Sequence, residues 1–240
     1  MEIYFADKEN TTAEAILENG IALHRDLKLG IIDVKRNAPV IWSHTLYVPG
    51  RPEIVDYTDT INGGIPSFKS RDIKIVCDRE DVGKWNMKAS DIIQRFHGKK
   101  MHILFSDDPE HYFVGRIDLS ADKINAVYNE YTFTITCNPY RYVLPSLSEY
   151  FTDFIPDDRI SRQYDFYLGR YCGMIEADYE KSGYSVGYID IFDDEGRMRQ
   201  SQPLIDEKGT ISFSPSVFGN IKFQFVGISK ITMNGSNLEV

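Results

Sequence analysis

The segment "FHGKKMHILFSDDPEHYFVGRIDL" (residues 96–119) predicts a β-hairpin. In "MHILFS" every second residue from Met101 is apolar, which places Met101, Ile103 and Phe105 on one face of a strand. "HYFVGRIDL" alternates in the same way, and the Asp-Asp-Pro-Glu sequence between the two runs is typical of a turn. We therefore expect two antiparallel strands joined by this turn.

An amphipathic helix is expected directly before the hairpin, within "NMKASDIIQRFHG" (residues 86–98). Apolar residues recur at i, i+3, i+4 and i+7 from Ala89 to Phe96, and Gly98 follows as a stop signal. After the hairpin, "NEYTFTITCN" (residues 129–138) alternates as a third strand. The helix is expected to pack its apolar stripe on the sheet that these strands form.

The N-terminal part predicts a short helix within residues 10–21, where Thr11 and Glu14 have capping-box spacing and Gly20 is expected to be a left-handed stop. A strand is expected over residues 23–36, followed by another that begins at "APVIW".

Residues 49–67 contain three prolines and three glycines and predict a long irregular connection. Such long connections are often functional or form an interface.

The sequence changes character near residues 140–150, and short strand-like segments separated by glycine-rich and acidic turns follow. This pattern predicts a small antiparallel β-sandwich. We expect a mainly β chain with two domains: residues 1–143 form a β-barrel or β-sheet domain with one packed helix, and residues 144–240 form the sandwich.

Composition excludes several classes of partner. The 240 residues carry a net charge of −9, which argues against binding to nucleic acid or to an anionic membrane. "MEIYFADKEN" lacks the features of a signal peptide, so the chain is expected to start in the compartment that makes it. The three cysteines, Cys77, Cys137 and Cys172, are widely spaced and are expected to be buried free thiols.

His97, His102 and His111 flank Asp107 and Asp108, which raises the question of a metal or acid–base site. Their spacing matches no compact ligand set, and solvent-facing imidazoles on a half-exposed hairpin are the favoured interpretation. No nucleophile elbow or phosphate-binding loop occurs. We expect no enzyme activity and no catalytic, cofactor-binding or metal-binding residue; a metal-dependent hydrolase using His102 and His111 remains an alternative.

Tyrosines of the C-terminal part could stack on sugar rings, although packing is the favoured interpretation because tyrosine is frequent in this chain. These tyrosines are Tyr164, Tyr167, Tyr171, Tyr179, Tyr184 and Tyr188.

Residues 21–142 resemble the distal tail protein family of long-tailed, non-contractile bacteriophages and their prophages. The resemblance is carried by the "VPGR" turn with Asp56-Tyr57-Thr58 after it, the strands "SFKSRDIKI" and "YFVGRI", and the closing "TFTITCNPYRY". Each motif alone is weak, but their order and spacing over about half of the chain are specific.

The resemblance implies a structural protein of the virion tail tip, made and assembled in the cytoplasm of the bacterial host. Its N-terminal domain forms a homo-oligomeric, commonly hexameric, ring, and its sandwich is galectin-like or like a carbohydrate-binding module. The partners it implies are the tail tube protein, the tail-associated lysin or fibre, and receptor-binding proteins of the baseplate. The alternative is a stand-alone carbohydrate-binding or adhesion protein in which the sandwich acts alone.

Overall fold

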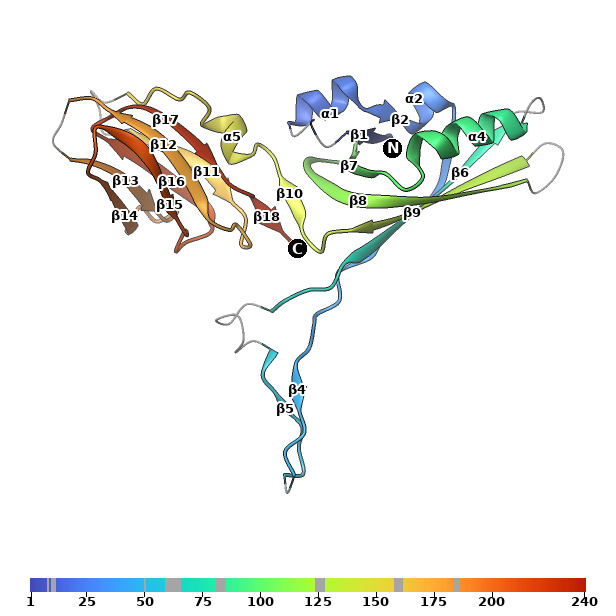
Figure 1. Cartoon of the computed structure of the whole chain (residues 1–240), viewed down its shortest axis with the longest axis horizontal. Coiled ribbons are helices and arrows are strands. Elements are labelled where there is room, and N and C mark those ends of the chain that lie inside the picture. The colour runs from blue at the N-terminus through green and yellow to red at the C-terminus, as the bar shows by residue number, and fades with distance from the viewer. Residues whose placement is uncertain are drawn as a thin grey trace. The chain divides into compact units, whose positions relative to one another are not determined.

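The computed structural model describes most of the chain in two compact units. One unit is Met1–Arg141 with Val240, and the other is Tyr142–Glu239 (Figure 1). The described residues are 1–7, 9, 12–49, 51–58, 66–80, 85–123, 128–157, 162–183 and 186–240. Both units are built mainly of antiparallel strands, so the predicted β class is confirmed.

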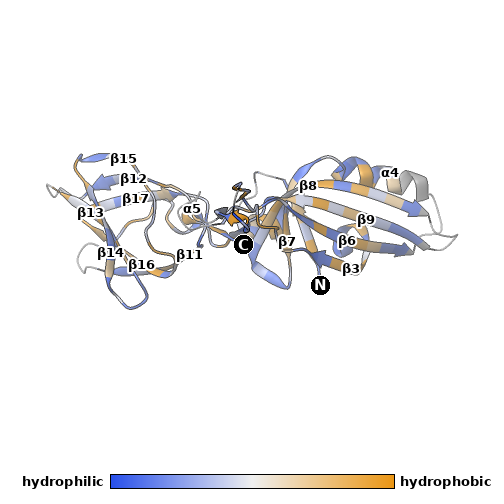
Figure 2. Cartoon of the chain, turned by 90° about the horizontal axis from the view of Figure 1, so that it is seen from below, coloured by the Kyte–Doolittle hydropathy of each residue, from blue (hydrophilic) through white to orange (hydrophobic). Residues whose placement is uncertain are grey.

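One antiparallel sheet organises the N-terminal unit, with strand order β2-β1-β7-β8-β9-β6-β3. The strands of this unit are β1 (Ile3–Ala6), β2 (Ile21–Ala22), β3 (Gly30–Arg36), β4 (Thr45–Leu46), β5 (Val55–Asp56), β6 (Arg71–Glu80), β7 (Lys100–Phe105), β8 (Asp108–Lys123) and β9 (Tyr128–Cys137). Its helices are α1 (Ala13–Asn19), α2 (Leu23–Leu27) and α4 (Trp85–Phe96). Figure 2 shows apolar and polar residues alternating along β6, β8 and β9.

The predicted hairpin is confirmed as β7 and β8, paired with Met101 opposite Gly115. The register shifts between Leu104 and Phe105, and β8 already begins at Asp108, so the turn is shorter than the sequence suggested. Gly115 is required by a close approach, because a Cβ there would lie 2.6 Å from the Cys137 Sγ atom. The hairpin and β9 therefore pack tightly against each other.

The predicted amphipathic helix is confirmed as α4, and its stripe is buried in the core of the sheet. The Phe96 ring lies 5.3 Å from that of Phe5 and 5.6 Å from that of Phe133, both nearly edge-on. Edge-to-face packing of this kind adds to the burial of apolar area. Gly98 has a φ of +77°, as expected for the glycine that stops the helix.

Helix α1 forms, but its ends differ from the prediction. Its N-cap is Thr12, whose hydroxyl accepts a hydrogen bond from the Ala15 N–H at 3.1 Å, while Thr11 lies outside the described residues. Gly20 is not left-handed, since its φ is −74°. Glycine is needed there because a Cβ would lie 2.2 Å from the Ile16 carbonyl oxygen as the chain enters β2.

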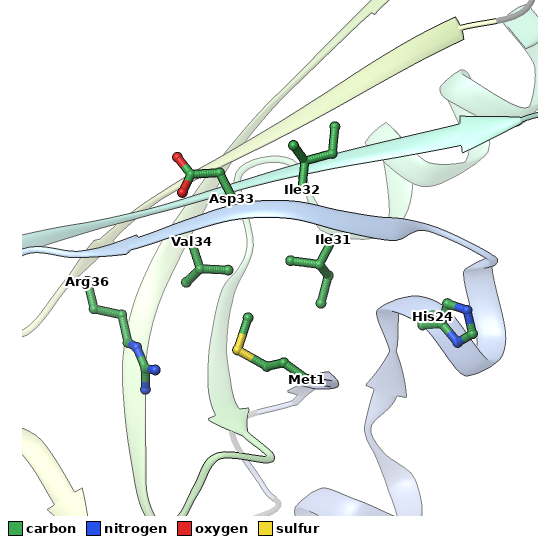
Figure 3. A pocket seen from close by; sticks show the side chains of 7 residues that line it. All are labelled: Met1, His24, Ile31, Ile32, Asp33, Val34 and Arg36. Atoms are coloured by element: carbon green, nitrogen blue, oxygen red, sulfur yellow. The ribbon is translucent and has the colours of Figure 1, made fainter.

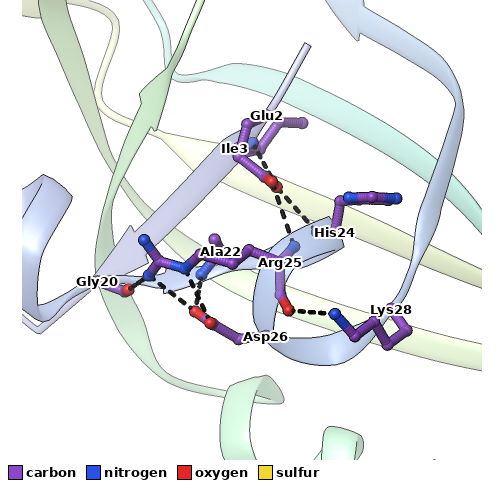
Figure 4. A network of polar contacts seen from close by, with 8 residues as sticks. All are labelled: Glu2, Ile3, Gly20, Ala22, His24, Arg25, Asp26 and Lys28. Atoms are coloured by element: carbon purple, nitrogen blue, oxygen red, sulfur yellow. Dashed lines mark hydrogen bonds and ion pairs between the residues drawn. The ribbon is translucent and has the colours of Figure 1, made fainter.

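The strand predicted over residues 23–36 is wrong in its first part, which forms the helical turn α2 before β3 begins. The cause is a distant residue: the Glu2 carboxylate accepts hydrogen bonds from the His24 N–H at 2.8 Å and the Arg25 N–H at 3.2 Å (Figure 4). These bonds satisfy N–H groups at the start of the turn, and Lys28 ends it with a φ of +57°.

Asp26 makes the stability of this region depend on pH. Its hydrogen bond with the Arg25 guanidinium and then one from the Ala22 N–H lower the pKa of its carboxyl from 3.8 to about 2. A lowered folded-state pKa stabilises the protein above the unfolded pKa, and this contribution is lost as the pH falls through the folded pKa. Asp26→Asn is therefore expected to be less stable than the original chain near neutral pH, and urea unfolding should show this difference shrinking from about pH 5 to about pH 2. A difference that stays constant over this range would contradict the assignment.

The C-terminal unit contains two sheets, of strand order β11-β16-β13-β14 and β15-β12-β17. Its strands are β11 (Gln163–Leu168), β12 (Ile175–Lys181), β13 (Gly187–Phe192), β14 (Met198–Leu204), β15 (Lys208–Phe213), β16 (Gly219–Val226), β17 (Ile228–Asn234) and β18 (Leu238–Glu239), which pairs with β10 (Arg141–Val143). Side chains of both sheets and of helix α5 (Leu147–Tyr150) share one buried cluster. No helix among the described residues has the length and apolar character needed to span a membrane.

Candidate interaction surface

Between β3 and β6 the chain leaves the sheet as a two-stranded ribbon, called the arm (residues 37–49, 51–58 and 66–70). Its base is hydrogen-bonded from the Asn37 N–H to the Asp72 carbonyl at 3.3 Å and from the Lys69 N–H to the Val40 carbonyl at 2.8 Å. Ile41 then pairs with Phe68 in an antiparallel bridge. The arm therefore continues the two strands from which it arises (Figure 1).

The outer part of the arm is held by β4 and β5, where Thr45 lies opposite Asp56. The Asp56 carboxylate accepts hydrogen bonds from the Thr58 hydroxyl at 2.6 Å and the Thr58 N–H at 2.9 Å, and these bonds lower the pKa of Asp56. The Thr58 hydroxyl in turn accepts a bond from the His44 N–H at 2.8 Å. The two short strands are thus tied together by side chains as well as by the backbone.

The surface of the arm is unusually apolar. Six large apolar side chains on it are between 50% and 70% exposed: Val40, Ile41, Trp42, Leu46, Tyr47 and Ile54. Apolar residues gathered in this way on a protruding segment are typical of an interaction surface. The sequence predicted an irregular connection over 49–67 but not this exposure, because "APVIWSHTLYVP" reads equally well as a strand with a buried face.

The histidines of the hairpin are not brought together. His102 is only 6% exposed and lies 5.0 Å from the Tyr112 ring, while the His111 Nδ1 atom lies 2.6 Å from an Asp108 carboxylate oxygen. His97 Nδ1 accepts a bond from the Leu119 N–H at 3.1 Å. The prediction of solvent-facing imidazoles is therefore wrong for His102, because both faces of β7 are buried. It is also wrong for His111, whose side chain on β8 is only 13% exposed. In the described part of the chain, no three His, Cys, Asp or Glu side chains form a group that could hold a metal ion.

The three cysteines are buried and free, as predicted. Burial raises the pKa of Cys77 and of Cys137 to about 12 and that of Cys172 to about 11. The reactive thiolate form is therefore disfavoured at neutral pH, and these residues serve as core side chains.

The tyrosines singled out in the sequence do not form one surface. Tyr179 is buried and Tyr164 packs on the Phe154 ring at 4.8 Å, while Tyr184 lies outside the described residues. Tyr167 and Tyr188 are exposed, but their strands pair with β16 at Asn220 and Val226, six residues apart.

A pocket of about 390 Å³ lies beside β3, the last strand of the sheet (Figure 3). It is lined by Met1, His24, Ile31, Ile32, Asp33, Val34 and Arg36. Figure 3 shows Met1, Ile31 and Val34 together on one side of β3, so the pocket has apolar side chains next to the end strand of the sheet.

Comparison with solved structures finds a similar architecture in a phage protein. The crystal structure of the Dit protein (gp 19.1) of phage SPP1, a paradigm of the hub adsorption apparatus of phages that infect Gram-positive bacteria, aligns with a TM-score of 0.56. The alignment covers 88% of this chain and 95% of that chain, at 13% identity. The chain has the fold of this hub protein. The Dit fold thus agrees with the family that the sequence resembles.

Two structures of the phage p2 baseplate in its activated conformation, with Sr and with Ca, also align over 97% of this chain and 96% of theirs. At 11% identity their TM-scores are 0.39 and 0.35, below the level that shows a common fold. A scan against models of protein families and a search of curated proteins give no match.

Proposed function

We propose that the chain is a structural hub protein of a phage tail tip, which forms a ring that joins the tail tube to baseplate, lysin or receptor-binding components. The Dit fold, aligned over 95% of the SPP1 protein, carries this proposal. The role is structural rather than catalytic, without a cofactor. The virion tail tip is its place of action, after synthesis and assembly in the cytoplasm of the bacterial host, in a phage or a prophage.

The arm supports self-association as the way in which the ring forms. Its exposed apolar side chains lose contact with water only if another surface covers them. Strands β2 and β3 end the sheet, and an exposed strand edge is a place where another chain can pair. In a closed ring each copy contacts two neighbours, so the arm of every copy is covered by the next copy and no arm remains exposed. A hexamer with a neighbouring tail tube, lysin or fibre is the assembly we propose.

The arm variant Trp42→Ser/Leu46→Ser/Tyr47→Ser tests this proposal. The original chain is expected to self-associate in sedimentation velocity as its concentration is raised, and the arm variant is expected to remain monomeric. Because these side chains are exposed, the melting temperature of the monomer should change little.

The matched control has three apolar residues of the C-terminal unit, each more than 60% exposed, changed to serine: Ile155, Met174 and Ile205. This control should self-associate like the original chain. An original chain that stays monomeric at its highest soluble concentration, or an arm variant that associates as well as the control, would contradict the proposal.

A further inference from the structure

The two strands that flank the arm each have an arginine at the end next to the arm. Arg36 is the last residue of β3 and Arg71 is the first residue of β6. The Arg36 guanidinium lies over the Phe105 ring at 4.6 Å, and that of Arg71 lies over the Phe113 ring at 5.4 Å. The two rings themselves meet edge-on at 5.9 Å. The base of the arm thus holds two cations on one pair of aromatic rings.

Among the described residues, an acidic partner is found for Arg36 but not for Arg71. Arg36 Nη2 lies 2.6 Å from an Asp107 carboxylate oxygen. Arg71 is only 8% exposed, yet no described residue gives its guanidinium a hydrogen bond or an ion pair. Its Nε atom is buried and has no hydrogen-bond acceptor. Burial, together with the like charge of Arg141, lowers the pKa of Arg71.

A guanidinium in this position favours one kind of partner. A buried charge without a counter-ion is costly, and stacking on an aromatic ring offsets only part of that cost. The planar fork of arginine fits a carboxylate through two parallel hydrogen bonds. Asp108 pairs with the neighbouring Arg141 at 3.4 Å and with His111 at 2.6 Å, so this acid is already engaged. No described residue supplies a carboxylate to Arg71.

We infer that Arg71 receives an aspartate or glutamate side chain of a second copy of this chain when copies associate. This inference rests on the proposed ring. Arg71 directly follows the arm, so a copy that covers the apolar surface of the arm is brought to its base. Each copy also carries 36 acidic residues against 27 lysines and arginines, so a second copy has many carboxylates that can accept hydrogen bonds from Arg71.

The test compares the self-association of the full chain with that of Arg71→Met, Arg71→Lys and Lys74→Met. Loss of a charge-assisted hydrogen bond is expected to raise the dissociation constant of Arg71→Met about tenfold or more. Arg71→Lys keeps the charge but loses the fork, so an intermediate value is expected. Lys74 is exposed on the same strand, which makes Lys74→Met a control for the change in net charge.

Monomer stability separates this role from a purely structural one. Methionine removes an unpaired buried charge, so the melting temperature of the dissociated Arg71→Met chain should stay the same or rise. A lower melting temperature with unchanged association would overturn the inference and leave the ring proposal standing. Equal weakening by Lys74→Met would also overturn it. If the original chain and the arm variant are both monomeric, the ring proposal falls and this inference with it.

Discussion

Replacing Phe133 by alanine is expected to lower the free energy of unfolding by about 3–5 kcal/mol. Phe133 is fully buried on β9, and its ring lies 5.6 Å from both Phe5 and Phe96. It therefore joins the first strand, the sheet and helix α4, and its removal leaves a cavity that these elements cannot easily close. Urea unfolding followed by circular dichroism measures the change.

Thr134→Ala is the control for this variant, because Thr134 is the next residue of β9 and faces away from the core. Its effect is expected to stay within about 0.5 kcal/mol. If Phe133→Ala is no more destabilising than Thr134→Ala, the packed side chains of Phe5, Phe96 and Phe133 are not the centre of the N-terminal core.

Gly169→Ala is expected to destabilise the C-terminal unit strongly. An alanine Cβ would lie 2.3 Å from the Leu238 carbonyl oxygen and 2.7 Å from its carbon, so the backbone of the last strand has to move. The movement also strains two bonds of the buried Asn237, whose side chain accepts from the Gly169 N–H at 2.6 Å and donates to the Tyr167 carbonyl at 2.9 Å. Overpacking of this kind typically costs about 1–3 kcal/mol, to which the strained bonds add.

Gly173→Ala is the matched control, four residues further along the chain. No atom lies within 4 Å of the Cβ position at Gly173, and its φ is not in the left-handed region. This variant is expected to be neutral or slightly stabilising, because alanine restricts the unfolded chain. Thermal unfolding of both variants provides the comparison, and equal melting temperatures would refute the close approach of Leu238 to Gly169.

The features predicted correctly from the sequence are local ones. Strand alternation around Met101, the helical spacing from Ala89 to Phe96 and the stop at Gly98 each depend on neighbours within a few residues. The helical turn α2 was missed because the carboxylate that accepts from its first N–H groups belongs to Glu2, more than twenty residues away in the sequence. Strand β1 was missed for a similar reason, since its four residues gain their structure from pairing with β7, about a hundred residues later.

The exposed surface of the arm could not be predicted from local sequence patterns either. Pattern alone does not distinguish an apolar run that packs inside its own chain from one that remains exposed, as Trp42 and Tyr47 do. The unpaired charge of Arg71 was also missed, because its burial results from the approach of Phe113, on a distant strand. The order of motifs that resembles the distal tail protein family pointed to the correct fold, but the contacts that support the proposed assembly became visible only in three dimensions.

The continuity of the arm with β3 and β6 has a mechanical consequence. A pull along the arm runs parallel to β6, whose ten residues from Arg71 to Glu80 all have partners on β9. Such a load stresses these backbone hydrogen bonds together, in shear, rather than opening them one after another. In the proposed hub, a subunit held by its arm would pass tension directly into the ladder of ten residue pairs between β6 and β9.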